Sequence, residues 1–288
     1  GGPAGAFIVL VAATGAKFGI EGLLLALPVS GMMLTLVGLL RLGTLIRHAP
    51  PLHRQFQKNA DPCLSVLERS MKAFVSWSSG KDSAFALHEA RRSGIEIAGV
   101  LTTINEVHDR VAMHGVRSAL LDRQIAALGV PAIKVAIPSP CPNEIYEARM
   151  EEACAAIRGQ GIRHIVFGDL FLEDIRAYRM EKLAAAGMEP VFPLWLRDTA
   201  QLAHDMIVSG LVTHVACLDP RKMPRALAGR RFDETLLRDL PAGVDPCGEN
   251  GEFHTAVSAG PMFAAPIPVR IGETVERDGF VFTDIIPA

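Results

Sequence analysis

Residues 75–84 read VSWSSGKDSA, and they decide the fold because they join an apolar run to a helical one through a loop of small residues. The preceding residues 72–77 have the apolar and aromatic content of a strand, and the apolar residues of 83–93 recur at helical spacing. A helix N-terminus has unpaired backbone N–H groups with partial positive charge, so an anion binds there readily. The stretch therefore predicts a phosphate-binding loop at the end of a strand.

The same loop excludes one familiar kind of phosphate site. A Walker A loop has the pattern G-x-x-x-x-G-K-[ST], which grips the β- and γ-phosphates and places a hydroxyl on magnesium. Here Val75 stands where the first glycine belongs and Asp82 stands where the hydroxyl belongs. The alternative to a phosphate site is a strand-to-helix turn capped by Asp82 or Ser79. In a phosphate site Gly80 would permit close approach, Lys81 would supply a mobile positive charge, and hydroxyl groups would come from Ser78, Ser79 and Ser83.

Strand-like and helical runs alternate after Met71, which is the pattern of a parallel α/β sheet. The expected strands are 72–77, 95–104, 132–137, 164–167 and 212–218, and the expected helices are 83–93, 116–128, 143–158, 172–186 and 200–209. Ligands of open parallel sheets bind beyond the carboxyl ends of the strands, which places the chemistry in the loops after Trp77, Ile104, Ile137 and Phe167.

After Asp219, prolines and glycines break this rhythm and indicate a smaller, irregular second lobe. We therefore expect a nucleotide-binding domain over 71–190 and a substrate lobe over 191–288.

The composition disfavours several classes of protein. The net charge of −2 gives no reason to expect a nucleic-acid partner, and residues 71–288 are acidic, with 23 Lys/Arg against 28 Asp/Glu. The five cysteines are widely spaced and include no C-x-x-C pair. We therefore expect no structural zinc, and a reducing, cytoplasmic location for residues 71–288.

The first seventy residues have a different character. Residues 22–40 form a run of 19 uncharged residues, about the length of a membrane-spanning helix, and a basic flank follows. A buried helical hairpin of a soluble protein is the alternative. Residues 1–47 resemble an internal stretch of the sulfate permease family. A stretch of this length is too short to transport anything alone. Because Met71 directly precedes the first clear strand, we also expect that the functional protein could start there.

A second motif is IVFGDLFLEDIRAYRMEKL, residues 165–183, in which a buried strand ends at Gly168-Asp169 and a charged helix follows. Asp169 would lie on the ligand side of the sheet, where a carboxylate can hold Mg²⁺ or a substrate amine. Acidic residues that favour the helix dipole explain Glu173 and Asp174 equally well. Asp169 and Arg176 are therefore the stronger candidates.

A third motif, VDPCGENGEFHT at 244–255, gathers carboxylates, an amide, a thiol and an imidazole in a glycine-broken loop. Loops of this kind usually bind ligands, although a tight turn before a strand is the alternative. Cys247 could act as a nucleophile only if its pKa were lowered. In a fourth stretch, 111–131, His114 precedes a helix and is either a cap or surface residue or a site residue beyond a strand end.

Four stretches together resemble the diphthine-ammonia ligase-like branch of the ATP pyrophosphatases: SWSSGKDSAFAL (76–87), GDLFLEDIRAYR (168–179), PLWLRDT (193–199) and DPCGENGEFHT (245–255). The resemblance spans essentially all of 71–288, and GENGEFHT is its most family-specific element. The pyrophosphate loop of these enzymes is usually SGGxDS, whereas this chain has Ser79 for the first glycine. The substitution is plausible where a positive φ is not required.

The resemblance implies a PP-loop (HUP-type) nucleotide-binding α/β domain with a smaller C-terminal lobe. It implies that ATP adenylates a carboxylate, pyrophosphate leaves, and ammonia displaces AMP to form an amide on an acceptor that the sequence does not identify. The implied cofactors are ATP and Mg²⁺, with Asp169 as a ligand of Mg²⁺. The residues implied to hold pyrophosphate are Ser78, Ser79, Gly80, Lys81, Asp82 and Ser83. Those implied to face the nucleotide or the acceptor are Gly168, Asp169, Glu249, Asn250, Glu252 and His254. The expected catalytic residues are Lys81, Asp82, Asp169, Glu252 and His254.

Two other functions stay open. One is a regulatory module that binds an adenine nucleotide without turnover. The other is a tRNA-modifying PP-loop enzyme, which would normally need paired cysteines or a sulfur carrier and a basic RNA surface. The acidic balance and the cysteine spacing disfavour the second, and membrane contact is expected only through residues 1–47. We therefore favour an ATP-dependent amide ligase.

Overall fold

The computed structural model describes residues 71–288. The membrane-spanning or hairpin segment expected in residues 1–70, and its resemblance to a permease, lie outside the described residues. Within residues 71–288, none of the helices combines the length and the apolar character that crossing a membrane would require.

The first sheet contains five parallel strands. These are β1 (Lys72–Ser76), β2 (Glu96–Asn105), β4 (Ala132–Ile137), β5 (His164–Val166) and β6 (Glu189–Val191). Their pairings give the spatial order β4-β2-β1-β5-β6. The two-residue strand β3 (Arg110–Val111) pairs antiparallel with the end of β2. The predicted α/β architecture with a parallel sheet is therefore confirmed.

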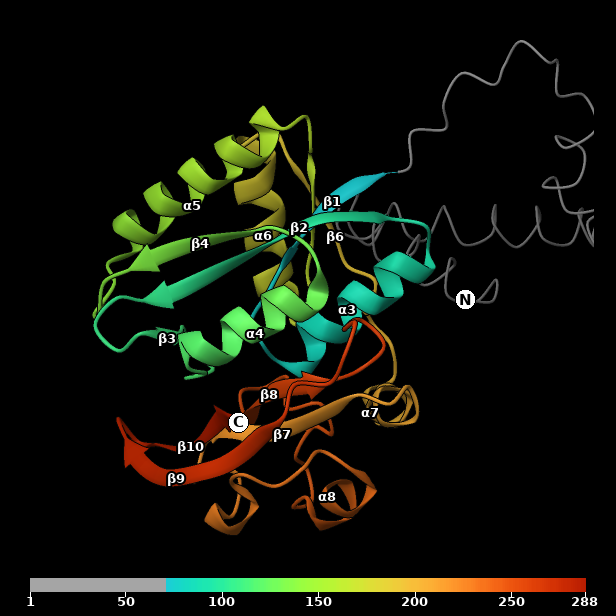
Figure 1. Cartoon of the computed structure of the whole chain (residues 1–288), viewed down its shortest axis with the longest axis vertical. Helices are drawn as coiled ribbons and strands as arrows, with labels where there is room; N and C mark the ends of the chain where they lie inside the picture. The colour runs from blue at the N-terminus through green and yellow to red at the C-terminus, as the bar shows by residue number, and fades with distance from the viewer. Residues whose placement is uncertain (1–70) are drawn as a thin grey trace, which may run out of the picture. The chain divides into compact units, whose positions relative to one another are not determined.

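Four helices cover the two faces of this sheet, as Figure 1 shows. The helices α3 (Lys81–Arg92) and α4 (Ser118–Leu128) pack on one face with Ala73 and Val75 of β1. The helices α5 (Asn143–Gly159) and α6 (Glu173–Ala185) pack on the other face with Phe74. The alternation along β1 thus sends neighbouring side chains into opposite cores.

The chain leaves β1 and β5 toward opposite faces of the sheet, because α3 lies on one face and α6 on the other. Adjacent parallel strands whose connections diverge in this way leave a crevice at their carboxyl ends, and ligands of doubly wound sheets bind there. The fold therefore places the 78–83 loop and Gly168-Asp169 at the same crevice.

The second sheet is antiparallel, in the order β8-β7-β10-β9. Its strands are β7 (Val212–Leu218), β8 (Phe253–Ala259), β9 (Val269–Arg277) and β10 (Phe280–Pro287). The accompanying helices are α7 (Thr199–Val208), the short 3₁₀ helix η2 (Arg225–Leu227) and α8 (Glu234–Asp239).

Two sequence-based expectations were wrong here. The strand at 212–218 does not complete the parallel series, since β7 pairs antiparallel with β8 and β10. The second lobe is also not irregular, because the prolines and glycines of 241–251 lie in a connection and leave the strands that follow intact. Gly and Pro mark turns, and turns between antiparallel strands disturb no pairing.

The two sheets share one hydrophobic core. One cluster of buried side chains joins Val75 and Leu87 of the first layer to Val215, Phe253 and Val257 of the second. Residues 71–288 accordingly belong to one compact unit, and the second sheet lies on the α3–α4 side (Figure 1). The expected domain boundary between residues 190 and 191 stays a prediction.

Candidate nucleotide-binding site

The backbone of the 78–83 loop has a left-handed turn at Ser79, whose φ is 69°. The condition under which serine is readily tolerated here, a φ that is not positive, is therefore not met, since the position adopts the conformation that favours glycine. The Ser79 hydroxyl is buried, and it has no hydrogen-bond partner among the described residues. Serine at this position does not favour the left-handed backbone conformation, so contacts from other parts of the chain must stabilise the loop.

Three contacts from outside the loop hold it. The Ser79 carbonyl accepts hydrogen bonds from the Val257 backbone N–H at 2.9 Å and from the Gln124 side-chain amide at 3.3 Å. The backbone N–H of Lys81 donates to the Thr255 hydroxyl at 3.0 Å. Gln124 is fully buried and also accepts a hydrogen bond from the Trp77 indole at 3.1 Å. Strand β8 and helix α4 therefore fix the loop between them.

The helix α3 begins without a cap from its own loop. Its N-cap residue is Gly80, and the Ser79 and Asp82 side chains form no capping hydrogen bond. The Ser83 hydroxyl donates to the Gly80 carbonyl at 3.1 Å and lies 3.1 Å from the Ser78 hydroxyl. The turn is thus not capped by its own loop, and apart from the Lys81 N–H, which donates to Thr255, the N-terminus of α3 can accept an anion.

Lys81 is not the mobile charge that the sequence suggested, because its side chain is only 1% exposed. Its ammonium lies 2.9 Å from both carboxylate oxygens of Asp82 and donates to the Cys247 carbonyl. It also lies over the rings of Phe232 and Phe253, at 5.7 and 5.2 Å from their centroids. Burial lowers the pKa of the Lys81 ammonium, but Asp82, Cys247 and Glu249 together outweigh this effect, and the pKa is raised. Lys81 is a fixed cation behind the loop.

Gly168 lies against the start of α3. A Cβ at this position would meet the carbonyl oxygen of Asp82 at 2.8 Å and the backbone nitrogen of Ser83 at 2.9 Å. Its neighbour Asp169 pairs with the Arg179 guanidinium, with distances of 2.6 and 3.0 Å. The Asp169 carboxylate therefore lies at the crevice as predicted, but its charge is already balanced by a cation from α6.

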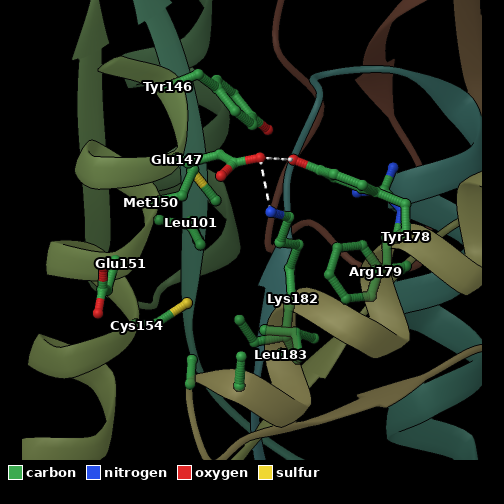
Figure 2. Close-up of a pocket in the computed structure, with 14 residues that line it drawn as sticks. Leu101, Tyr146, Glu147, Met150, Glu151, Cys154, Tyr178, Arg179, Lys182 and Leu183 are labelled. Atoms are coloured by element: carbon green, nitrogen blue, oxygen red, sulfur yellow. Dashed lines mark hydrogen bonds and ion pairs between the residues drawn. The ribbon is translucent and has the colours of Figure 1, made fainter. Parts of the chain in front are cut away.

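Arg179 also lines a cavity of about 260 Å³ between α5 and α6. Figure 2 shows its apolar floor and the Glu147–Lys182 ion pair at 2.8 Å, with the Tyr178 hydroxyl 3.5 Å from the same Glu147 oxygen. The other strong candidate of this motif, Arg176, lies instead over the rings of Trp195 and Phe192.

Glu249 comes from the 244–255 motif and reaches the same crevice. One of its carboxylate oxygens accepts a hydrogen bond at 2.8 Å from the backbone N–H of Leu170, directly after Asp169. Burial raises the pKa of the Glu249 carboxyl to about 7, and the negative charges of Asp82 and Asp169 act in the same direction. The carboxyl groups of Asp82, Asp169 and Glu249 and the Lys81 ammonium are therefore close enough to influence one another's charge.

The other residues of this motif mainly shape the loop. Glu252 is 4% exposed, and its carboxylate accepts hydrogen bonds from the Asn250 amide at 3.2 Å and the Asp245 backbone N–H at 3.3 Å. Asn250 is exposed, and its backbone carbonyl accepts a hydrogen bond from the Lys222 ammonium at 2.6 Å. Burial raises the pKa of the Cys247 thiol well above its ordinary value, so the nucleophile reading is disfavoured.

His114 and His254 form a pair beside the phosphate loop, with ring centroids 4.6 Å apart. A Cβ at Gly80 would lie 2.6 Å from the His114 ring, so this glycine makes room for the histidine. His114 Nδ1 lies 3.2 Å from the Thr255 carbonyl. Burial lowers the pKa of His114 to about 4 and that of His254 to about 3. Both imidazoles are therefore neutral at pH 7.

The fold gathers most of the residues named from sequence. The 78–83 loop, Gly168, Asp169 and Glu249 converge at the crevice, and His254 lies next to His114 beside Gly80, whereas Glu252 and Asn250 belong to the turn that carries Glu249. Sequence reasoning missed Thr255, Gln124 and Arg179. Gln124 left a signal, because it occupies the apolar side of α4 between Leu121 and Leu128, where a buried amide must find partners.

The site combines a phosphate loop at the switch point of a parallel sheet with carboxylates from two other segments, and the loop lacks the Walker A pattern. These features define a nucleotide-binding protein of the ATP pyrophosphatase type. Two family models match the chain. The diphthamide synthase N-terminal domain matches residues 71–189, and the diphthamide synthase C-terminal domain matches residues 198–285. The chain belongs to the diphthine-ammonia ligase-like (diphthamide synthase) family of PP-loop proteins.

Curated relatives agree with this family. A diphthine--ammonia ligase of Danio rerio is 34% identical over 123 residues, which cover 40% of this chain and 47% of the relative. The protein of the same name in Rattus norvegicus is 29% identical over 120 residues, covering 40% and 45%. The one in Schizosaccharomyces pombe is 34% identical over 96 residues, covering 32% and 16%. The matched stretch thus spans less than half the length of each relative.

Among solved structures, a predicted subunit of tRNA methyltransferase from Methanocaldococcus jannaschii is 14% identical, with a TM-score of 0.35. The match covers 66% of this chain and 98% of that one. With so low a TM-score, the fold assignment rests on the strand order of this chain itself.

Proposed function

We propose that the protein is an ATP-dependent amide ligase that adenylates a carboxylate, releases pyrophosphate and transfers ammonia to the activated acyl group. The observation that carries this proposal is the uncapped N-terminus of α3, beside a buried lysine and the carboxylates of Asp169 and Glu249. Such a site favours a departing anion over a γ-phosphate transfer, because the Walker hydroxyl is replaced by Asp82. Membership of the diphthamide synthase family supports the same reaction.

The 78–83 loop would hold the β- and γ-phosphates as the leaving pyrophosphate. The Lys81 backbone N–H is taken by Thr255, so the anion would use the first-turn N–H groups that follow it, and the hydroxyls of Ser78 and Ser83 lie at the same end of the helix. Lys81 stabilises the growing charge from behind, as a fixed cation that does not reorganise during the reaction. Asp82 holds this lysine in place.

The bonds change in two steps. In the first, an oxygen of the acceptor carboxylate attacks the α-phosphorus, the α–β bridging P–O bond breaks, and pyrophosphate carries away the electron pair. In the second, the nitrogen of ammonia attacks the acyl carbon, the bond between that carbon and the phosphate oxygen breaks, AMP leaves with the oxygen and the electron pair, and one proton is released from the nitrogen. The pKa of His254 is lowered to about 3, so its imidazole is a weak base and the proton passes to solvent.

The residues present could hold Mg²⁺ only together with ATP. Among residues 71–288, no group of three or more His, Cys, Asp or Glu side chains is arranged to hold a metal ion. Mg²⁺ is commonly held by one or two carboxylates and the phosphates of a nucleotide. Glu249 and Asp169 offer such oxygens, and the neighbouring carboxylate of Asp82 supports the proposal of a further positive charge there. The metal would screen the phosphate charge.

The experiment that tests this function follows the position of ATP cleavage. The full chain is incubated with ATP labelled on the α-phosphate, ammonium and a desalted cell extract as the source of acceptor. We expect AMP and pyrophosphate, formed only when an acceptor is present, and no product with Asp82→Ala or Lys81→Ala. Circular dichroism of each variant separates lost chemistry from lost fold. Formation of ADP and phosphate alone would contradict cleavage between the α- and β-phosphates.

The alternative of a regulatory module has a distinct signature in the same assay. Tight ATP binding with no turnover in any extract would favour a regulatory module. A cytoplasmic location and the lack of a nucleic-acid partner stay predictions.

A further inference from the structure

A second cavity lies next to the phosphate loop, with a volume of about 370 Å³. One wall comes from the carboxyl ends of the parallel strands, at Asn105 after β2 and Ser139 after β4. The opposite wall comes from β9 and β10 of the second sheet, at Val275, Phe280 and Phe282. The cavity therefore opens on the edge of the sheet where ligands of this fold bind.

His254 connects this cavity to the phosphate loop. It lines the cavity, and its ring contacts that of His114, which fills the space left by the missing side chain of Gly80. A molecule bound in the cavity would thus be separated from the loop by the rings of His254 and His114. This is the position that an acceptor needs, because its carboxylate must be held in line with the α-phosphorus of ATP.

One group of charged residues in the lining carries an excess of positive charge. Arg110 and Arg117 share one carboxylate, that of Asp284, at distances of 3.0 Å from Arg110 and 2.7 and 2.9 Å from the Arg117 Nε. Asp284 is 11% exposed, and Arg110 also donates to the Gly115 carbonyl at 2.6 Å. Two guanidinium groups on one carboxylate leave a net charge of +1 and unused N–H donors, which suit a second carboxylate.

The lining has further charged groups. Glu273, Arg277 and Asp278 are exposed, and so is the Arg117 side chain at 47%, so water screens their charges. The apolar side chains of the lining offer contact for the body of a small molecule or a modified side chain. Asp284 is the least exposed of the charged groups, at 11%, and it holds Arg110 and Arg117 together.

We propose that this cavity is the acceptor site, and that Arg110 and Arg117 recognise the carboxylate of an acceptor whose apolar part packs on Phe280 and Phe282. The inference rests on the proposed ligase function, but its test measures binding and does not depend on that function. It assigns the two arginines as specificity-determining residues and Asp284 as the residue that positions them.

The test measures binding of three matched probes to the full chain by saturation-transfer NMR: 3-phenylpropionate, its neutral amide and 3-phenylpropylamine. We expect the carboxylate to bind at least about tenfold more tightly than the amide or the amine, because a charge-assisted hydrogen bond is lost with each of the others. Arg110→Ala and Arg117→Ala should each weaken carboxylate binding about tenfold. Arg230→Ala removes an arginine paired with Asp239 outside the cavity and should change nothing.

Three results would overturn the inference. They are tighter binding of the amine, carboxylate binding that survives in both arginine variants, and displacement of the carboxylate by ATP together with weaker ATP binding in Arg117→Ala. The last result would mean that the arginines bind a phosphate of the nucleotide. Thermal unfolding of each variant shows whether the fold persists, and Arg117→Gln, which keeps part of the packing, replaces any variant that does not fold. Selective carboxylate binding without AMP formation in any extract would support the cavity and overturn the ligase alone.

Discussion

Replacing Ser79 by glycine should make the protein more stable, although it removes a side chain from the site. Ser79 has a φ of 69°, and its buried hydroxyl has no partner among the described residues. Its carbonyl accepts hydrogen bonds from Val257 and Gln124, and Ser79→Gly leaves both in place. The substitution therefore acts on backbone strain and on one buried polar group.

The expected magnitude follows from three effects. A left-handed conformation costs an L-residue about 1–2 kcal/mol that glycine avoids. An unpaired buried hydroxyl costs a further ~1–3 kcal/mol. Glycine loses more backbone freedom on folding, which opposes these gains by about 0.5–1 kcal/mol. We expect a net increase of about 2 kcal/mol in the free energy of unfolding, or roughly 4–8 °C in Tm for a domain of this size.

The measurement is urea unfolding of the full chain, with Ser79→Ala as the matched control. Alanine removes the hydroxyl but keeps the strained φ, so it should be intermediate between wild type and Ser79→Gly. If Ser79→Gly is no more stable than Ser79→Ala, the strain assigned to this backbone position is wrong. A glycine variant less stable than wild type would refute both parts of the reasoning.

Three further predictions concern the neighbouring residues. Gly80→Ala should lower the free energy of unfolding by about 1–3 kcal/mol through overlap with His114, and His114→Ala in the same chain should restore part of it, as measured by a double-mutant cycle. Because the Glu249 carboxyl has a pKa of about 7 in the fold against an ordinary 4.5, its contribution to stability is full below pH 4.5 and is lost as the pH rises to 7, by up to about 1.4 kcal/mol per unit. Glu249→Gln should remove this slope from urea unfolding curves, and an unchanged slope would contradict the assignment. In native protein, iodoacetamide should modify the half-buried Cys141 well before Cys247, and mass spectrometry that finds the opposite order would contradict the buried thiol.

The local elements were readable from the sequence because each has its own pattern. The strand, loop and helix at 72–92 follow from an apolar run, small residues and helical spacing, and the structure has β1 and α3 there. The short strands β3 and β6 have two and three residues and carry no pattern that distinguishes them from loops. Element patterns were therefore sufficient for the first sheet except at its edges.

What the sequence could not show are contacts between distant segments. The strand at 212–218 has the apolar content of a parallel strand, and only its partners β8 and β10 make it antiparallel. The pairing of Asp169 with Arg179 was also not visible, because Arg176 lies on the same helix and has the same charge. The φ of Ser79 depends on Val257 and Gln124, which no local pattern near residue 79 could reveal.

The attachment of the phosphate loop to β8 has a consequence for biosynthesis. The hydrogen bond from the Lys81 backbone to Thr255 joins residues 174 positions apart, and contacts of such separation form late because the long intervening chain must first be closed. On the ribosome, β1, the loop and α3 emerge well before residues 255–257 are made. A nascent chain should therefore be unable to hold a phosphate in this loop until β8 has been synthesised, by which stage all of the first sheet is already present.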